Sequence, residues 1–314
     1  MIRAPAASRR PRLVVIVGAT GTGKSELALD LAESLIAAGR PAEIIGADAM
    51  QVYRGMDIGT AKLPLGARRG VPHHLIDILP PTAEYSVAEY QQAARDRIEA
   101  LQADGVVPIL VGGSGLYVSS VVRDFAFPAR DEAVRARLEA ELDAEGSVAL
   151  HARLSTRDPA AAERVDPANG RRIVRALEVV ELAGAFTPGL PEDRPPWQES
   201  VTIGLGLERA QLVARLDARA EAMWRDGLLA EVQALRDGPG LGRTAARAIG
   251  YAQALAELAG ELGRAEAMQQ TQALTRRYAR RQVGWFRRMP DVTWLDAAAE
   301  DRSALALARV LRED

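Results

Sequence analysis

The chain of 314 residues contains no cysteine and no apolar stretch long enough for a membrane helix. Without cysteine it has neither disulfide bonds nor cysteine-ligated zinc, which suits a reducing compartment, so we expect a cytoplasmic protein. The longest apolar run near the start, Leu13 to Ala19, is far shorter than the ~18 residues that a membrane span requires. These absences exclude disulfide scaffolds, cysteine-zinc modules and helical membrane proteins.

Lysine is almost as scarce, because only Lys24 and Lys62 are lysine among the 40 lysine and arginine residues. The basic residues are balanced by 42 acidic ones, which gives a formal net charge of −2. No overall positive charge therefore indicates a polyanionic partner, and any nucleic acid must bind a local basic patch. Hydrophobic residues make up 48% of the chain, enough for a substantial core.

The first third of the chain alternates short apolar runs with helical patterns. We predict strands at 13–17, 42–46 and 106–111 and a helix at 25–38. Ser86 and Glu89 have capping-box spacing, which predicts a second helix running towards Asp104. Strands separated by helices are typical of βαβ units, so the sequence predicts an α/β fold with a parallel sheet.

The middle of the chain changes character. Residues 123–194 are charged, alanine-rich and helical without a convincing strand, and they close in a proline-rich stretch at 188–196. We interpret them as an inserted helical subdomain. A strand at 201–207 then returns to the sheet, followed by helices around 209–226, 228–236, 249–260 and 264–288, a strand at 292–295 and a terminal helix. The predicted core is therefore 13–122 with 195–314, preceded by a flexible tail at 1–12.

A phosphate-binding loop is the strongest motif. The run from residue 18 to 25 matches G-x-x-x-x-G-K-[ST] and lies between a predicted strand and a predicted helix, the context that the motif requires. In such a loop the backbone N–H groups bind phosphate oxygens, Lys24 adds a point charge and the Ser25 hydroxyl can hold Mg²⁺. The candidate residues are Gly18, Ala19, Thr20, Gly21, Thr22, Gly23, Lys24 and Ser25. The motif indicates phosphate without identifying the reaction.

Two further polar positions follow predicted strands. Asp48 comes just after the strand at 42–46, where open parallel sheets bind their ligands. Its carboxylate suits a Mg²⁺ ligand or a general base, and a purely structural cap of the next segment is the alternative. Ser114 lies in a glycine-rich turn after the strand at 106–111. That turn is either a substrate wall or only a tight turn.

Arginines gather in two places. Residues 276–288 carry six arginines and no acid, interleaved with Tyr278, Trp285 and Phe286, a composition that suits RNA phosphates and unstacked bases. A helix with an apolar core side and a solvated arginine face explains the same pattern equally well. A second cluster surrounds Arg171, Arg172 and Arg175, although Arg175 has Glu178 and Glu181 as nearby partners. The adjacent His73 and His74 are more typical of structural residues than of metal ligands.

Taken together, these segments resemble the bacterial tRNA dimethylallyltransferase (IPP transferase) family. The motifs that carry the resemblance span nearly the whole chain in order: the phosphate loop, the segment from Asp48 to the end of Gly-Met-Asp-Ile-Gly-Thr-Ala-Lys62, Val111 to Tyr117, Arg172 to Glu178, Arg247 to Tyr251 and Tyr278 to Trp285. Such a set is far more specific than the phosphate loop alone.

The resemblance implies a P-loop NTPase-like fold that binds a prenyl diphosphate. It implies transfer of the dimethylallyl group, with Mg²⁺, from dimethylallyl diphosphate to N6 of the adenosine next to the anticodon of tRNAs that read codons beginning with U. It also implies that Asp48 is the general base, that Ser114 supplies a hydroxyl where the family usually has threonine, and that Arg219 lies near the diphosphate. The implied contacts to the tRNA anticodon stem-loop are Asp48, Ala49, Met50, Gln51, Ser114, Arg135, Arg171, Arg172, Arg175, Arg247, Gly250, Tyr251, Arg280 and Arg281.

The match is not complete. Ala49 and Met50 replace a more usual Ser-Arg pair, and Asn169-Gly170 stands where an aspartate-containing sequence is common. Two other functions fit the phosphate loop and Asp48: a small-molecule or nucleoside kinase, and a nucleotide-dependent RNA-binding module without transferase activity. We expect a monomer that makes no membrane contact. Lys62, the second lysine, has no ligand that the sequence defines, although its rarity points towards the active site.

Overall fold

The computed structural model describes residues 10–125, 127–128, 130–186 and 194–312. Residues 1–9 of the predicted tail and residues 187–193 of the proline-rich stretch lie outside this range. The chain separates into two compact units, Met1–Arg123 with Pro196–Asp314 and Asp124–Pro195. Among the described residues, no helix is long and apolar enough to cross a membrane.

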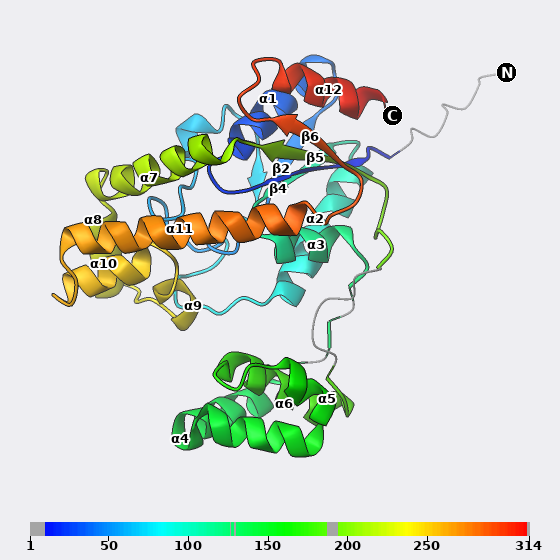
Figure 1. Cartoon of the computed structure of the whole chain (residues 1–314). Coiled ribbons are helices and arrows are strands. Elements are labelled where there is room, and N and C mark those ends of the chain that lie inside the picture. The colour runs from blue at the N-terminus through cyan, green and yellow to red at the C-terminus, as the bar shows by residue number, and fades with distance from the viewer. Residues whose placement is uncertain (1–9, 126, 129, 187–193, 313–314) are drawn as a thin grey trace. The chain divides into compact units, whose positions relative to one another are not determined.

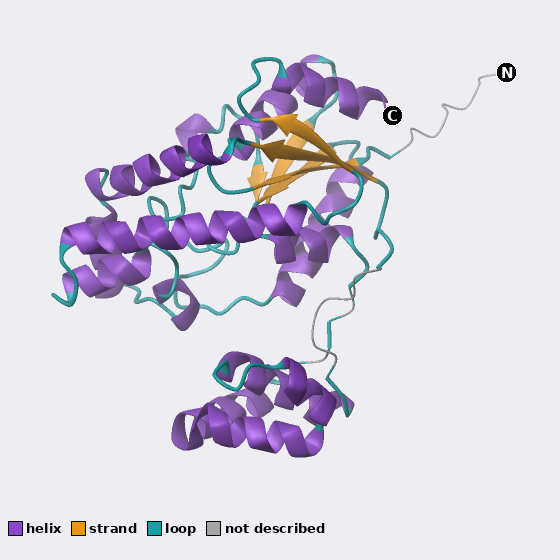
Figure 2. Cartoon of the chain, in the orientation of Figure 1, coloured by secondary structure: helices purple, strands orange, loops and turns teal. Residues whose placement is uncertain are grey.

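The larger unit is built on a six-stranded parallel sheet, drawn in orange in Figure 2. The strand order is β3-β2-β4-β1-β5-β6, so β1 lies between β4 and β5. The strands are β1 (Leu13–Gly18), β2 (Ala42–Gly46), β3 (His73–His74), β4 (Val107–Gly112), β5 (Ser200–Gly206) and β6 (Val292–Asp296). The carboxyl ends of β2, β4 and β1 therefore emerge side by side, where ligands of parallel sheets bind.

Both faces of the sheet are covered, which explains why β1 is apolar throughout. Val14 and Ile16 point into a core with α1 (Lys24–Ala37) and α12 (Arg302–Arg312). Leu13, Val15 and Val17 point into the opposite core, with α2 (Val87–Ala103) and α3 (Gly115–Val122). Successive strand residues alternate between faces, so a strand covered on both sides has no polar positions. Figure 1 shows these helices on the two sides of the sheet.

A helical layer extends the larger unit beyond the sheet (Figure 1). It packs around a third core that includes residues of the segment after β2, such as Val52 and Met56. This contact places that segment beside α8 (Leu228–Asp237) and α10 (Tyr251–Leu258). The helices are α7 (Arg209–Arg225), α8 (Leu228–Asp237), α9 (Arg243–Ala246), α10 (Tyr251–Leu258) and α11 (Arg264–Phe286).

The smaller unit is entirely helical among its described residues, with a core of its own around Leu150 and Ile173. Each helix starts at a side-chain cap: Asp131, Asp158 and Asn169 accept hydrogen bonds from first-turn backbone N–H groups. Gly146 has non-helical dihedrals and interrupts the first helix. The helices are α4 (Glu132–Arg157), α5 (Pro159–Arg164) and α6 (Gly170–Ala183).

The predicted α/β class, a parallel sheet flanked by helices with a helical insertion, is confirmed. The capping box is present, because Glu89 N donates to Ser86 Oγ at 3.2 Å and Ser86 N donates to the Glu89 carboxylate at 2.8 Å. The helix predicted at 249–260 is shorter and follows a separate short helix, α9. The sequence did not predict the edge strand β3, the 3-10 helix η1 (Leu65–Ala67) or helix α3.

Candidate active site

Three loops meet at the carboxyl edge of the sheet. The phosphate loop follows β1, Asp48 follows β2, and Ser114 follows β4. The register pairs Gly46 of β2 with Val111 of β4, and Gly112 of β4 with Val17 of β1, so the three strands end at the same level. Residues that are far apart in sequence are thereby brought to one edge.

The phosphate loop turns tightly from β1 into α1. Gly18 has φ +149°, and a Cβ there would lie 2.6 Å from the Leu205 carbonyl oxygen, so only glycine fits. Inside the loop, the Ala19 carbonyl accepts hydrogen bonds from Thr22 Oγ1 at 2.9 Å and Lys24 Nζ at 2.7 Å. Ser25 lies exposed in the first turn of α1, where a helix N-terminus favours anions.

A polar cavity of about 230 Å³ opens in front of this loop. Its lining joins α7 and α11 to the three sheet loops, so Arg219 meets Lys24 and Asp48 there. The lining residues are Thr20, Gly21, Gly23, Lys24, Ser25, Glu26, Asp48, Gln51, Thr60, Ala61, Val111, Gly112, Gly113, Arg219 and Gln282.

The two cations of this cavity are partly removed from water. Burial lowers the pKa of Lys24 from 10.5 to about 8, against the opposing effect of the Asp48 charge, while Arg219 lowers it further. Burial also lowers the pKa of Arg219, and Asp48 opposes that shift. Glu26, the other acid of the lining, lies 3.5 Å from Arg302. Asp48 alone thus faces two desolvated cations, an arrangement that favours binding of a further anion.

Asp48 has one oxygen engaged and one available. Its Oδ1 accepts hydrogen bonds from Met50 N at 2.8 Å and Gln51 N at 3.4 Å, so the structural cap considered from the sequence is real. Within the described part of the chain, no group donates to Oδ2. Capping and proton transfer therefore use different oxygens, and both roles are compatible.

Ser114 lies beside Asp48. Its Oγ accepts a hydrogen bond from Ala49 N at 3.4 Å and lies 3.4 Å from the Tyr278 hydroxyl of α11. Burial and, to a lesser degree, the Asp48 charge raise the pKa of Tyr278, and the Ser114 hydrogen bond partly opposes this. Ser114 and Tyr278 are not in the lining of the cavity, but they lie close to Asp48, which is.

Gln282 is a site residue that the sequence did not single out. From α11, its Oε1 accepts a hydrogen bond from Thr20 N at 2.8 Å, and its Nε2 donates to the Gly113 carbonyl at 2.7 Å. A Cβ at residue 113 would lie 2.6 Å from that Nε2, so only glycine permits the contact. Gln282 therefore ties the phosphate loop to the turn that carries Ser114.

Glu231 holds the segment that leads into Thr60 and Ala61 of the cavity lining. Its carboxylate accepts hydrogen bonds from the backbone N–H groups of Asp57, Ile58 and Gly59, at 3.1, 2.7 and 3.3 Å. The Tyr251 hydroxyl donates to it at 2.5 Å. Tyr251 is fully buried by these contacts, so it acts here as a core residue rather than as an exposed surface for RNA.

Lys62 has a different role from Lys24. Its ammonium donates to the Tyr53 carbonyl at 2.8 Å, to Asp57 at 2.7 Å and to Asp77 at 2.5 Å, and its side chain is 3% exposed. The expectation that its rarity points to the active site is therefore wrong: Lys62 does not line the cavity, whereas its neighbours Thr60 and Ala61 do. The sequence could not show this because Asp77 is distant along the chain.

The other predicted RNA contacts of the larger unit vary in exposure. Arg247, Arg280 and Arg281 are exposed, and Arg281 lies over the Tyr278 ring at 5.7 Å. Phe286 is fully buried, so α11 has an apolar core side as well as an arginine face. Gly250 is buried at the start of α10. Met50 and Gln51 are partly buried next to Asp48.

In the smaller unit, the predicted RNA contacts divide into two pairs. Arg171 and Arg172 are exposed in the first turn of α6. Arg135 and Arg175 instead contact the fully buried Glu178, at 3.2 and 2.8 Å. The ion pair anticipated for Arg175 is therefore present, and it leaves Arg171 and Arg172 as the more accessible cations.

The cavity also fits Mg²⁺. Among the described residues, no group of three histidine, cysteine, aspartate or glutamate side chains could hold a metal ion. Mg²⁺ commonly keeps several waters and binds through one or two protein oxygens plus substrate phosphates, so a full protein cage is not required. The Ser25 hydroxyl and the Asp48 carboxylate supply oxygens of this kind. His73 and His74 lie instead in β3, where His74 Nε2 contacts Glu43 at 2.6 Å.

Comparison with known proteins identifies the family. The model of the family described as IPP transferase matches residues 51–289. The tRNA dimethylallyltransferase of Clavibacter sepedonicus is 58% identical over 286 residues, which cover 91% of this chain and 93% of that protein. The chain belongs to the IPP transferase family. A second relative in the family, the tRNA dimethylallyltransferase of Salinispora arenicola, is 54% identical over 95% of this chain and 86% of its own length.

Solved IPP transferase structures agree with this assignment. The full-length tRNA isopentenylpyrophosphate transferase of Bacillus halodurans is 37% identical, with a TM-score of 0.69 over 97% of this chain and 98% of its own. A eukaryotic dimethylallyltransferase acting on tRNA has a TM-score of 0.76 at 26% identity, over 97% of this chain and 79% of its own. The resemblance drawn from the motifs is confirmed, and the chain is a transferase of this family.

Proposed function

We propose that this IPP transferase moves the dimethylallyl group from dimethylallyl diphosphate to N6 of the adenosine next to the anticodon of tRNA. One observation carries the proposal beyond family membership. A single cavity combines a phosphate loop and two desolvated cations, Lys24 and Arg219, with an Asp48 oxygen that accepts no hydrogen bond from any described residue. This arrangement suits a reaction in which a diphosphate leaves and a proton is taken up.

The chemistry explains why a base is needed. The lone pair of the adenine N6 amine is delocalised into the ring, so the amine is a weak nucleophile. As N6 forms a bond to the allylic C1, the C1–O bond breaks and the diphosphate leaves with the electron pair. Asp48 accepts the N6 proton, using the oxygen that does not cap Met50. Ser114 and Tyr278 lie beside this step and orient the reacting amine.

The leaving diphosphate is held by the phosphate loop. Negative charge that develops on the bridging oxygen is stabilised by loop N–H groups, Lys24 and Arg219. The Ser25 hydroxyl would hold Mg²⁺ beside the diphosphate, and the ion would supply further charge neutralisation there. Water has to be kept from the allylic diphosphate, which it would otherwise hydrolyse, and a bound tRNA that covers the open side of the cavity would do so.

The tRNA is held by local arginines, because the chain has no overall positive charge. On the larger unit, Arg247, Arg280 and Arg281 are exposed, and on the smaller unit Arg171 and Arg172 are exposed. These cations suit backbone phosphates, whereas the target base has to leave its stack to reach Asp48. We assign to the smaller unit a role in binding the anticodon stem-loop.

The test is mass analysis of tRNA after incubation with the protein, Mg²⁺ and dimethylallyl diphosphate. A gain of one C5H8 unit, located by nuclease digestion at the adenosine beside the anticodon, is expected. A tRNA that reads codons beginning with U should react, and one with cytidine in place of that adenosine should not. Phosphorylation from ATP without prenylation would instead identify a kinase, and RNA binding with neither product would identify a binding module.

A further inference from the structure

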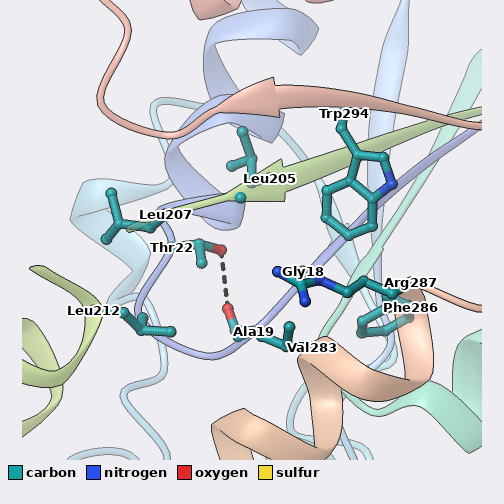
Figure 3. Close-up of a pocket in the computed structure, with 11 residues that line it drawn as sticks. Gly18, Ala19, Thr22, Leu205, Leu207, Leu212, Val283, Phe286, Arg287 and Trp294 are labelled. Atoms are coloured by element: carbon teal, nitrogen blue, oxygen red, sulfur yellow. Dashed lines mark hydrogen bonds between the residues drawn. The ribbon is translucent and has the colours of Figure 1, made fainter. Parts of the chain in front are cut away.

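A second cavity lies against the phosphate loop, and none of its lining residues lines the first cavity, which we call the diphosphate cavity after its proposed ligand. It has a volume of about 350 Å³ and lies between the ends of β5 and β6, the start of α7 and the end of α11 (Figure 3). Its lining residues are Gly18, Ala19, Thr22, Leu205, Gly206, Leu207, Leu212, Val283, Phe286, Arg287 and Trp294. Nothing in the proposed reaction uses this space.

The walls of this cavity are mostly apolar and include an exposed aromatic ring. Trp294 is 42% exposed on β6, and Figure 3 shows its ring facing the same space as Val283 and Leu205. Large exposed aromatic side chains beside a cavity are typical of binding sites, because a ligand removes their apolar surface from water. A volume of this size suits a small ligand with an apolar body.

Arg287 gives the cavity its charge. Its side chain reaches from the end of α11 towards the phosphate loop at Gly18 in Figure 3. No acidic side chain lines the cavity, and within the described residues Arg287 forms no ion pair. The other polar side chain of the lining, Thr22, already donates its hydroxyl to the Ala19 carbonyl. One cation therefore faces a space whose walls are mostly apolar.

We propose that this cavity binds a small amphipathic anion, with its apolar body against Trp294, Leu205 and Val283 and its acidic head paired with Arg287. A nucleobase fits less well, because the lining has no side-chain amide or carboxylate to hydrogen-bond a base edge. A carboxylate and a phosphate monoester share the required chemistry, since both accept bidentate hydrogen bonds from arginine.

The test is calorimetric titration of the full chain with octanoate or octyl phosphate, with octanol as the neutral match. Excess inorganic diphosphate is present throughout, so that the diphosphate cavity is already occupied. Both anions should bind with 1:1 stoichiometry and about tenfold more tightly than octanol, because a charge-assisted hydrogen bond contributes that much. A higher affinity for octanoate indicates a carboxylate ligand, and a higher affinity for octyl phosphate indicates a phosphate ligand.

Three variants locate the site. Arg287→Ala should lower the affinity for both anions about tenfold and leave the affinity for octanol unchanged. Arg288 is an exposed neighbour outside the lining, so Arg288→Ala should change none of these affinities by more than about twofold. Gly206→Leu should abolish binding of all three probes by filling the cavity. A Cβ at residue 206 meets nothing closer than 3.9 Å, so this variant should fold, which a thermal melt checks.

Three results would overturn the proposal: no saturable binding to the wild-type chain, binding that Gly206→Leu leaves intact, or equal losses in Arg287→Ala and Arg288→Ala. A loss of tRNA affinity in Arg287→Ala and Trp294→Ala, without any octanoate binding, would assign this surface to RNA and also overturn it. None of these readouts depends on prenyl transfer.

Discussion

The two lysines of the chain lie in environments that differ in one decisive respect. The ammonium of Lys62 is neutralised by Asp57 and Asp77 and caps the Tyr53 carbonyl. Within the described residues, the ammonium of Lys24 donates a hydrogen bond only to the Ala19 carbonyl. The nearby Asp48 charge does not offset the effect of burial, and the pKa of Lys24 falls to about 8. Lys62 is fully and Lys24 partly shielded from water, but among the described residues only Lys62 has acidic hydrogen-bond partners.

This difference separates a structural cation from a functional one. A buried charge with paired acids holds the fold together, and removing it leaves those acids without a partner. A buried charge without a paired acid costs stability in the free protein and is compensated when an anionic ligand arrives. We therefore assign Lys24 to the proposed diphosphate site, whereas Lys62 holds the segment that contributes Thr60 and Ala61 to the cavity wall.

Replacing each lysine with methionine should produce opposite effects. Lys24→Met should lower the turnover number for prenyl transfer by ~10²–10³, because a preorganised cation is lost from the leaving diphosphate. Its free energy of unfolding should be unchanged or higher. Lys62→Met should lower the free energy of unfolding by about 1–3 kcal/mol, because the buried Tyr53 carbonyl and two acids lose their donor.

Steady-state kinetics and urea denaturation measure the two effects. Assays of Lys62→Met are made where more than nine-tenths of the protein is folded, so that unfolding does not mimic lost catalysis. If Lys24→Met loses stability, or if Lys62→Met loses as much turnover as Lys24→Met while folded, the distinction between the two lysines is wrong.

Gln282 tests the geometry of the same cavity. Gln282→Ala removes the link between Thr20 N and the Gly113 carbonyl, which lets the phosphate loop shift relative to Ser114. We expect a ~10–100-fold lower turnover number with tRNA affinity within a few-fold, since small displacements of reacting groups are costly. Gln272→Ala is the matched control, because Gln272 is a half-buried residue of the same helix that bonds to Asp217 and Glu221 and does not line the cavity. Equal turnover numbers for the two variants would show that Gln282 does not position the phosphate loop for catalysis.

Sequence reasoning predicted most of this framework and missed its long-range contacts. The strands β1 and β4 are readable because both of their faces are buried, so their residues are continuously apolar, and β2 is interrupted only by Glu43. The strand β3 is not readable, since it consists of two histidines paired at an edge. The cross-link made by Gln282 depends on partners 262 and 169 residues away, which no local pattern encodes. The contacts of Lys62 span only 5 to 15 residues, but they lie in a largely irregular segment that no helix or strand period predicts.

The same limit applies to the predicted RNA contacts. A basic residue in the sequence does not reveal whether an acid lies opposite it in the fold. Arg175 is paired with the buried Glu178, and Tyr251 is buried against Glu231, whereas Arg280 and Arg281 remain exposed. The exposure of each side chain, which only the structure supplies, thus shows which of the predicted RNA contacts are accessible.

The arginines of α11 allow a direct comparison between an arginine that is paired with an acid and two that are exposed. Arg280→Gln with Arg281→Gln should make the dependence of log K for tRNA on log salt shallower by about 1.4, the change for two lost phosphate contacts on a single strand. Arg276→Gln on the same helix should change it less, because Arg276 is paired with Asp217 at 2.6 Å. Filter binding over a range of salt concentrations measures the slopes. An unaltered slope in the double variant would show that this face does not bind phosphates.

Lys24 also makes the stability of the folded chain depend on pH. Its pKa is about 8 in the folded chain and 10.5 ordinarily, so the unfolded chain binds more protons between these pH values. Stability contributed by this group therefore rises with pH across that window and is lowest below about pH 8. The stability gained by Lys24→Met should be largest near pH 7 and shrink towards pH 10. Denaturation curves at several pH values test this, and a gain that grows with pH would contradict it.

The most direct test of the account is the single-turnover rate of Asp48→Asn. Asparagine keeps an oxygen that can accept the hydrogen bond from Met50 N but cannot take up a proton, so the variant separates the cap from the base. We predict that the rate of prenyl transfer falls by ~10²–10⁴ while the affinities for tRNA and diphosphate stay within a few-fold of the wild type. A rate within about threefold of the wild type, under saturating substrates, would contradict the assignment of Asp48 as the general base.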